Sequence, residues 1–281
     1  MRLFDLHCDT LTLSVPFSGH VKLEHARSFA SWAQVYAIFV PDDCPGPAAR
    51  FDEAYAFYQS NYSAITKACQ PILALENAKG NPHRLDELTV KGVRIISLTW
   101  NGENELGYGA HCDPALGLKP LGKDLLRRMR GLGILPDVSH LNRAGFWDVA
   151  AGGGPILATH SNCAAVHPCT RNLGDEQLRA IITSGGLVGL NLYTEFLGGE
   201  GTAADFARHL AHIIGLGGEN HVALGSDFDG CEIHPSLAGL DKMVCLDSEL
   251  QRLGFTAAQR EKLFWGNAEG FLGHLRQGGC I

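Results

Sequence analysis

Short apolar runs alternate with stretches of helical pattern along most of this sequence, and this alternation limits the folds open to it. The runs are rich in Val, Ile and Leu without polar alternation, which is typical of strands buried on both faces of a parallel sheet. They lie at Leu3–His7, Val35–Val40, Pro71–Glu76, Val93–Trp100, Ile134–His140, Pro155–His160, Leu187–Tyr193 and Val222–Phe228. Such alternation forms a closed barrel or a doubly wound open sheet. The count of eight favours an α/β fold of the (β/α)₈ TIM barrel type.

The segments between the runs indicate the same fold. Residues 121–129, 174–182 and 204–211 have the pattern of amphipathic helices, and glycines close several of the helical stretches. Residues 10–34 and 230–254 carry weaker patterns, so we expect loops and short helices there, over one face of the barrel. Barrels of this type often have about 250 residues, and no linker or break in composition divides the chain. We therefore expect one domain over residues 1–281.

Composition excludes several classes of function. The formal net charge of −7 gives no basic face for nucleic acid or for an anionic membrane. The apolar runs are strand-sized, and the first begins near the N-terminus, so we expect no membrane span and no signal peptide. The tail that contains Cys280 is too short to signal a lipid anchor. Nine cysteines without a C-x-x-C pair predict reduced thiols in a cytoplasmic protein.

Polar residues gather at the C-terminal ends of the predicted strands. Active sites of barrel enzymes lie at this end, built from the ends of several strands. Three histidines and at least three carboxylates therefore converge on one mouth of the predicted barrel. The residues in question are His7, Asp9, Glu76, His140, His160 and Asp227.

This set of side chains has the composition of a metal site. Neutral imidazole and carboxylate groups are ligands of zinc and similar divalent ions. His7 and Asp9 are two residues apart, so they share one strand face or the turn beyond it and can bind one ion. Glu76 can bridge two ions through its two oxygens, and His140 and His160 can complete a second site. We predict two divalent ions, which would lower the pKa of a bound water to roughly 7 and polarise a carbonyl oxygen.

Two further residues fit a hydrolytic reaction at this centre. Asp227 can accept and donate a proton beside the activated water. Arg171 follows the sixth run, and its planar guanidinium suits a substrate carboxylate. Taken singly, each residue has a structural interpretation: Glu76 could cap a helix, Asp227 could belong to a turn, and Arg171 could form a surface ion pair. Their placement at one end of the barrel favours the functional interpretation.

The motifs that carry these residues resemble those of the membrane dipeptidase (renal dipeptidase) family of the amidohydrolase superfamily. The resemblance runs along nearly the whole chain in order. It rests on Asp5-Leu6-His7-Cys8-Asp9-Thr10, Leu75-Glu76-Asn77, Asp137-Val138-Ser139-His140, Ala158-Thr159-His160-Ser161-Asn162 with Arg171-Asn172, Gly225-Ser226-Asp227-Phe228-Asp229-Gly230 and Gly266-Asn267-Ala268.

The resemblance implies two zinc ions, hydrolysis of dipeptides, including ones with a C-terminal D-residue, and often a homodimer. It also implies that Asp227 handles protons at the scissile amide and that Arg171 recognises the substrate carboxylate. The chain departs from the family after the fourth run, where Trp100 stands in place of a histidine that contacts the substrate. Trp100 can donate one N–H but cannot act as an imidazolium. We expect it either to line the substrate pocket or to pack under a loop.

Three functions stay open at this point. The first is a binuclear metal-dependent dipeptidase that acts on a small peptide substrate. The second uses the same metals to cleave another amide, a lactone or an N-acyl amino acid, which the departure at Trp100 allows. The third is a catalytically silent binding protein on a barrel scaffold. A catalytically silent protein would be expected to have lost some of the metal ligands. All five predicted ligands and Asp227 are present, which disfavours this third function.

Overall fold

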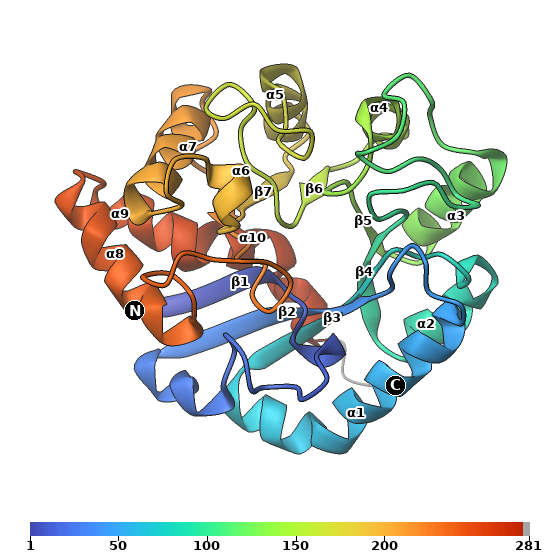
Figure 1. The fold of residues 1–281 in the computed structure, drawn as a ribbon, viewed down its shortest axis with the longest axis horizontal. Helices are drawn as coiled ribbons and strands as arrows, with labels where there is room; N and C mark the ends of the chain where they lie inside the picture. The colour runs from blue at the N-terminus through green and yellow to red at the C-terminus, as the bar shows by residue number, and fades with distance from the viewer. Residues whose placement is uncertain (278–281) are drawn as a thin grey trace.

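Eight parallel strands form a closed barrel in the computed structural model, which describes residues 1–277 (Figure 1). Each strand pairs with the next along the chain, and β8 closes the barrel on β1. The strands are β1 (Arg2–Cys8), β2 (Ser31–Phe39), β3 (Gln70–Glu76), β4 (Val93–Ser97), β5 (Leu135–Asp137), β6 (Leu157–Ala158), β7 (Leu187–Leu190) and β8 (Val222–Leu224). The predicted (β/α)₈ barrel is confirmed. Cys280 and the other residues of 278–281 lie outside the described part of the chain.

Helices surround the strands, as Figure 1 shows. They are α1 (Pro47–Ala68), α2 (Leu85–Val90), α3 (Pro120–Gly131), α4 (Arg143–Ala151), α5 (Asp175–Thr183), α6 (Thr194–Leu197), α7 (Ala203–Gly215), α8 (Met243–Arg252), α9 (Ala257–Glu261), the π-helical turn η5 (Lys262–Gly266) and α10 (Asn267–Leu272). The three predicted amphipathic segments are confirmed as α3, α5 and α7. Within residues 1–277, no helix is both long and apolar enough to cross a membrane.

The two weakly patterned segments differ in part from the prediction. The link between β1 and β2 holds two 3₁₀ turns, η1 (Thr10–Thr12) and η2 (Leu23–Ser28), as expected, but its last four residues already belong to β2. Residues 230–254 contain the ten-residue helix α8 as well as a short turn, η4 (Leu240–Lys242). Tertiary packing stabilises α8, since its residues Met243, Leu246 and Leu250 are buried.

Several strands end earlier than their apolar runs predicted. The cause at β5 and β6 is Asp137, whose Oδ1 accepts hydrogen bonds from the backbone N–H groups of Ser139 and Thr159. A side-chain acceptor here replaces the sheet pairing that would have continued both strands. His140 and His160 therefore lie on the loops just beyond their strands, held close to the barrel axis.

An irregularity in β1 orients the first of the predicted metal ligands. Asp5 pairs with Gln34 and Cys8 pairs with Tyr36, so the two residues between them on β1 oppose one residue of β2. This is the geometry of a β-bulge, which re-aims a side chain next to an active site. Leu6 packs in the barrel interior and His7 points into the site above it.

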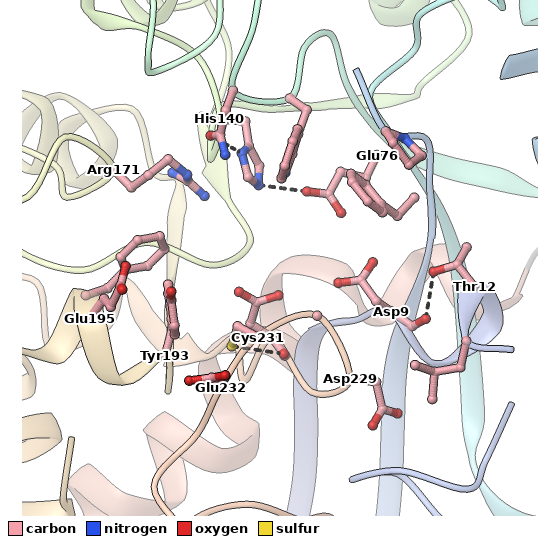
Figure 2. Close-up of a pocket in the computed structure, with 18 of the residues that line it drawn as sticks. Asp9, Thr12, Glu76, His140, Arg171, Tyr193, Glu195, Asp229, Cys231 and Glu232 are labelled. Carbon is pink, nitrogen blue, oxygen red and sulfur yellow. Dashed lines mark hydrogen bonds and ion pairs between the residues drawn. The ribbon is translucent and has the colours of Figure 1, made fainter. Parts of the chain in front are cut away.

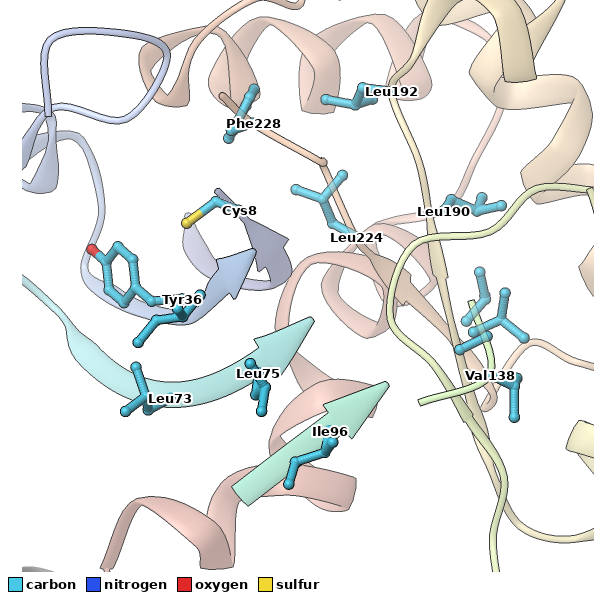
Figure 3. Close-up of a cluster of buried hydrophobic side chains, with 14 of the residues drawn as sticks. Cys8, Tyr36, Leu73, Leu75, Ile96, Val138, Leu190, Leu192, Leu224 and Phe228 are labelled. Atoms are coloured by element: carbon cyan, nitrogen blue, oxygen red, sulfur yellow. The ribbon is translucent and has the colours of Figure 1, made fainter. Parts of the chain in front are cut away.

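Two apolar layers hold the barrel together. The outer layer lies between strands and helices, and Figure 3 shows part of it, with Tyr36, Leu73 and Ile96 on successive strands. The inner layer fills the barrel with alternate residues of the strands, such as Phe4 and Val35. Trp265 belongs to this inner layer and lies 5.9 Å from the ring of Phe4, near the start of β1. The N-terminal end of the barrel is thus packed, and the C-terminal end is left for the site.

We predict that the backbone contact between β6 and β7 tolerates no side chain. A Cβ on Gly189 would lie 1.9 Å from the carbonyl oxygen of Thr159, whereas a Cβ on Gly215, at the end of α7, would meet nothing within 4 Å. Gly189→Ala should lower the free energy of unfolding by about 1–3 kcal/mol, because the strands must separate. Gly215→Ala should raise or keep it, within about 1 kcal/mol. Chemical denaturation of both variants tests this, and equal stabilities would contradict it.

Candidate metal centre and active-site cavity

A cavity of about 810 Å³ opens at the C-terminal ends of the strands. Six of the eight residues singled out from the sequence line it, and Figure 2 shows several of them converging on it. His7 and His160 are almost completely buried beneath its floor. The eight predicted residues therefore meet at one place. Those that line the cavity are Asp9, Glu76, Trp100, His140, Arg171 and Asp227.

Glu76 lies between two pairs of ligand-type side chains. Its Oε2 atom is 3.4 Å from Nε2 of His7, and Oδ2 of Asp9 is 3.5 Å from the same nitrogen. Its Oε1 atom is 2.7 Å from Nε2 of His140 and 3.8 Å from Nε2 of His160. One carboxylate thus faces a His–Asp pair with one oxygen and a His–His pair with the other, the arrangement predicted for a bridging ligand.

The atoms at this centre fit divalent metal ions. Nε2 of His7 and Oδ1 of Asp9 are buried and have no hydrogen-bond partner. Nε2 of His140 and Nε2 of His160 lie only 2.8 Å apart and face the same carboxylate oxygen. Buried polar atoms without partners are costly. Cations placed between these electron-pair donors would satisfy all of them, so the residues present fit the group that the sequence implies.

Hydrogen bonds on the far side of the two histidine rings set their tautomers. Nδ1 of His140 lies 2.9 Å from Oδ1 of Asn101, an acceptor only, so this nitrogen carries the proton. The Thr159 hydroxyl donates to Asp137 and therefore accepts from Nδ1 of His160, 2.8 Å away. Both Nε2 atoms consequently present a lone pair to the centre, as metal binding requires.

Asp137 also lies close enough to His7 and His160 to complete a group of ligand-type atoms. Its two oxygens accept hydrogen bonds from Ser139 and Thr159. Asp137 is therefore placed to orient the ligands rather than to bind an ion itself.

Burial and charge shift the pKa values at the centre. Burial, together with the charge of Asp9, raises the pKa of Glu76 to about 8, against the opposing effect of His7. Burial lowers the pKa values of His140 and His160 well below 6.5, and the positive charges of Arg171 and His7 lower them further. For His7, burial lowers the pKa, but the charges of Glu76 and Asp9 outweigh it and raise the pKa well above 6.5. The carboxylates thus favour the positively charged form of His7, whereas the rings of His140 and His160 stay neutral.

Asp227 stands beside the centre on a strained turn after β8. Its backbone has a φ of +62°, a conformation that residues other than glycine rarely adopt and that is often found at functional sites. Asn191 donates a hydrogen bond of 2.9 Å to its Oδ2, and its Oδ1 lies 3.9 Å from Nε2 of His7. Burial raises the pKa of Asp227, and the charge of Asp9 raises it further. A carboxylate in this setting is suited to accept and return a proton.

Arg171 is buried at one side of the cavity, with 4% of its surface exposed. Its Nε and Nη2 atoms have no hydrogen-bond partner, and it forms no ion pair within residues 1–277. The ring of Phe196 lies under the guanidinium, 5.3 Å from Cζ. The surface ion pair considered from the sequence is therefore wrong, and Figure 2 shows the unpaired group pointing into the cavity.

Trp100 lines the cavity as well, where its ring packs against Phe39 at 5.1 Å and lies 6.1 Å from the ring of His140. Of the two placements that the sequence left open, the structure has the one at the pocket. His111 lines the cavity as well.

Sequence analysis missed the residues that orient the site. Asn101, Thr159 and Asn191 hold His140, His160 and Asp227 respectively. Asn101 directly follows the fourth apolar run and Thr159 sits next to the predicted ligand His160, signals that could have drawn attention to them, whereas Asn191 lies inside the seventh run and carries no such signal. The partners of Asn101 and Asn191 come from other strands, so the chain order alone does not reveal those two pairings, whereas Thr159 holds the residue next to it.

The chain is similar to known metallopeptidases in sequence and structure. The family model for membrane dipeptidase (peptidase family M19) matches residues 66–269. An uncharacterized protein in the pqqA 5′ region of Klebsiella pneumoniae is 38% identical over 201 residues, which are 67% of this chain and 74% of that protein. Matches to two further curated relatives span only 44% and 36% of their lengths.

Two solved structures superpose on nearly all of the chain. A metallo peptidase from Rhodobacter sphaeroides, liganded with a phosphinate mimic of the dipeptide L-Ala-D-Ala, has a TM-score of 0.84 at 28% identity, covering 97% of this chain and 99% of that one. The metallo peptidase described as dipeptidase AC has a TM-score of 0.84 at 29% identity, covering 100% and 99%. Since the family model alone matches well over half of the sequence, the chain belongs to the membrane dipeptidase family, peptidase family M19.

Proposed function

We propose that this protein is a dipeptidase that binds two zinc ions and hydrolyses the amide bond of dipeptides, including ones with a C-terminal D-residue. The observation that carries the proposal is the position of Glu76, whose two oxygens face two separate pairs of ligand-type side chains. The family supports a metallopeptidase, and one relative is described with a mimic of L-Ala-D-Ala bound. A cleavage of lactones or other amides has no comparable support.

Each ion would have its own set of ligands. His7 and Asp9 would hold one ion and His140 with His160 the other, with Glu76 shared between them. Nitrogen and carboxylate ligands suit zinc. Such a pair of ions lowers the pKa of water to about 7 and polarises the carbonyl of the substrate.

The remaining residues bind the substrate and move protons. Arg171 would hold the C-terminal carboxylate of the dipeptide, which supplies the partners that its Nε and Nη2 atoms lack. Asp227 would take a proton from the attacking water and pass it to the leaving amine, while Asn191 holds its other oxygen in place. Trp100 would narrow the cavity beside His140 and contact the substrate there. A homodimer and a cytoplasmic location stay predictions, as does a single domain that reaches residue 281.

The metal prediction concerns stoichiometry. The protein reconstituted with zinc should contain about two ions per chain and should lose its dipeptidase activity to a chelator, because the ligand set exceeds the needs of one ion. Glu76→Gln should lower the content to one ion or less, since an amide bridges two cations poorly. Glu53→Gln, an exposed position on α1, serves as the matched control and should keep two. Elemental analysis of the reconstituted wild type that finds one ion or none would overturn the binuclear centre.

The second prediction separates proton transfer from metal binding. Asp227→Asn should keep two ions and the same Tm while kcat for a dipeptide falls roughly 10²–10⁴-fold, the usual effect of losing a general acid or base. Metal analysis, thermal denaturation and initial rates measure the three quantities. A near wild-type kcat would show that protons move through another group.

The third prediction concerns Arg171. Arg171→Met should lower kcat/KM about 10–100-fold for dipeptides with a free carboxylate, the scale of a charged hydrogen bond. The loss should come mainly through KM, and C-terminally amidated substrates should lose much less. The same variant should keep or raise the Tm, because it removes a buried guanidinium whose Nε and Nη2 atoms lack partners. Equal losses on free and amidated substrates would exclude carboxylate recognition by Arg171.

A further inference from the structure

Two carboxylates line the cavity on the side of Arg171 and take no part in the metal centre. Glu195 lies on the short helix α6, and Glu232 lies on the segment after β8. Both are exposed to the cavity mouth, and neither forms an ion pair within residues 1–277. Asp229, the other acidic residue at this mouth, differs from them because it accepts hydrogen bonds from the Thr10 hydroxyl and the backbone of His20.

The wall that carries the two glutamates is tied to Arg171. Tyr193 and Ile233 form an antiparallel bridge, and the N–H of Thr194 donates to the carbonyl of Glu232 at 3.1 Å, so the two segments lie side by side. Asn172, the residue after Arg171, donates to the carbonyl of Phe196 at 2.9 Å. Figure 2 shows Arg171, Glu195, Tyr193 and Glu232 on one side of the cavity, across from Thr12. Hydrogen bonds therefore hold the segments that carry the buried cation and the exposed carboxylates next to one another.

The pKa of the Tyr193 phenol is consistent with a negative potential at this wall. The pKa of Tyr193 is raised to about 12, first by burial, then by its hydrogen bond to Glu195 and by the charges of Glu195 and Glu232. A group with a positive charge placed here would meet two acceptors that lack a cation. The buried guanidinium of Arg171 independently marks the place of a ligand carboxylate, because its Nε and Nη2 atoms are unpaired.

We propose that Glu195 and Glu232 form the subsite for the side chain of the substrate's C-terminal residue, and that this subsite selects a cationic side chain such as that of lysine or ornithine. The inference rests on the proposed function, in which Arg171 holds the carboxylate of that same residue. The carboxylate and the side chain of the substrate's C-terminal residue are bonded to the same Cα atom. When Arg171 holds the carboxylate, the side chain therefore reaches the wall next to Arg171. A C-terminal residue with a negative carboxylate and a positive side chain has charges complementary to those of one arginine and two glutamates.

The part of the cavity around Thr12 is different in character. Leu13, Phe39 and Pro41 are apolar, Trp100 packs against Phe39, and Arg50 donates to the carbonyl of Thr12 at 2.7 Å. Among the residues that line the cavity, the carboxylates other than Glu195 and Glu232 belong to the proposed catalytic centre or, in Asp229, are already hydrogen-bonded, so none is left for a basic side chain of the N-terminal residue. Selection for a positive charge should therefore depend on the order of the two residues in the dipeptide.

The test compares substrates that differ only in charge. The zinc-loaded protein is assayed for kcat/KM on Ala-Lys and on Ala-norleucine, which has the same side-chain length without the ammonium group, with the C-terminal residue in the L and the D configuration. Lys-Ala and norleucine-Ala form the reversed pair. Wild type should prefer Ala-Lys over Ala-norleucine by about tenfold, the scale of a charge-assisted contact. The reversed pair should show no such preference.

The variants assign the preference to the two glutamates. In E195Q/E232Q the ratio between Ala-Lys and Ala-norleucine should fall to about one, and in E195K/E232K Ala-Glu should replace Ala-Lys as the better substrate. Glu200→Gln, an exposed glutamate after α6 that does not line the cavity, is the matched control and should keep the wild-type ratio. High salt should weaken the wild-type preference, since the carboxylates are exposed.

The outcomes separate this subsite from the proposed function. Equal kcat/KM for Ala-Lys and Ala-norleucine in the wild type would overturn the subsite and leave the dipeptidase intact. A preference for Lys-Ala instead would mean that the glutamates hold the N-terminal residue, which also overturns it. A protein with two ions that hydrolyses none of the dipeptides would refute the proposed function itself, and the subsite with it.

Discussion

The carboxylate of Glu76 is the interaction on which the arrangement of the site depends. One of its oxygens faces His7 and the other faces His140, so it joins side chains from opposite parts of the barrel wall. Such a buried concentration of carboxylates and ring nitrogens costs desolvation energy in every one of its members. The rise of the Glu76 pKa to about 8 expresses that cost for the chain by itself. Divalent cations between the ligand atoms would remove it, which is why the metal centre and the fold at this end of the barrel are best understood as one unit.

The barrel delivers these side chains through local departures from regular strands. The bulge in β1 lets Leu6 fill the interior while His7 faces the site. Asp137 ends β5 and β6 early and brings the loops that carry the two other histidines toward the axis. The positive φ of Asp227 turns its carboxylate beside the centre. Asp137 replaces sheet hydrogen bonds with side-chain ones, and the strained turn at Asp227 is held by the surrounding packed structure.

The cavity above the centre has two unlike walls. On one side, Arg171 and the exposed pair Glu195 and Glu232 provide opposite charges on segments that are hydrogen-bonded to one another. On the other side, Trp100 and Phe39 pack edge to face and present an apolar surface. In the proposed function, bond cleavage and the choice of substrate fall to different parts of the molecule. Cleavage would use the ends of β1, β3, β5, β6 and β8, while substrate selection would use the loops that follow β4, β6, β7 and β8.

The sequence by itself determined the barrel and the candidate centre. Eight apolar runs identify the strands because parallel barrel strands are buried on both faces, and metal-type residues at the ends of those runs must share one mouth. It did not determine where β5 and β6 end, because that depends on a hydrogen bond that Asp137 accepts from Thr159 on another loop. The burial of Arg171 and the position of Trp100 at the cavity also required the tertiary structure. The same holds for the pairing of Asn101 with His140 and of Asn191 with Asp227. Periodicity is a property of neighbours along the chain, whereas contacts between the loops of different strands arise only when the barrel closes.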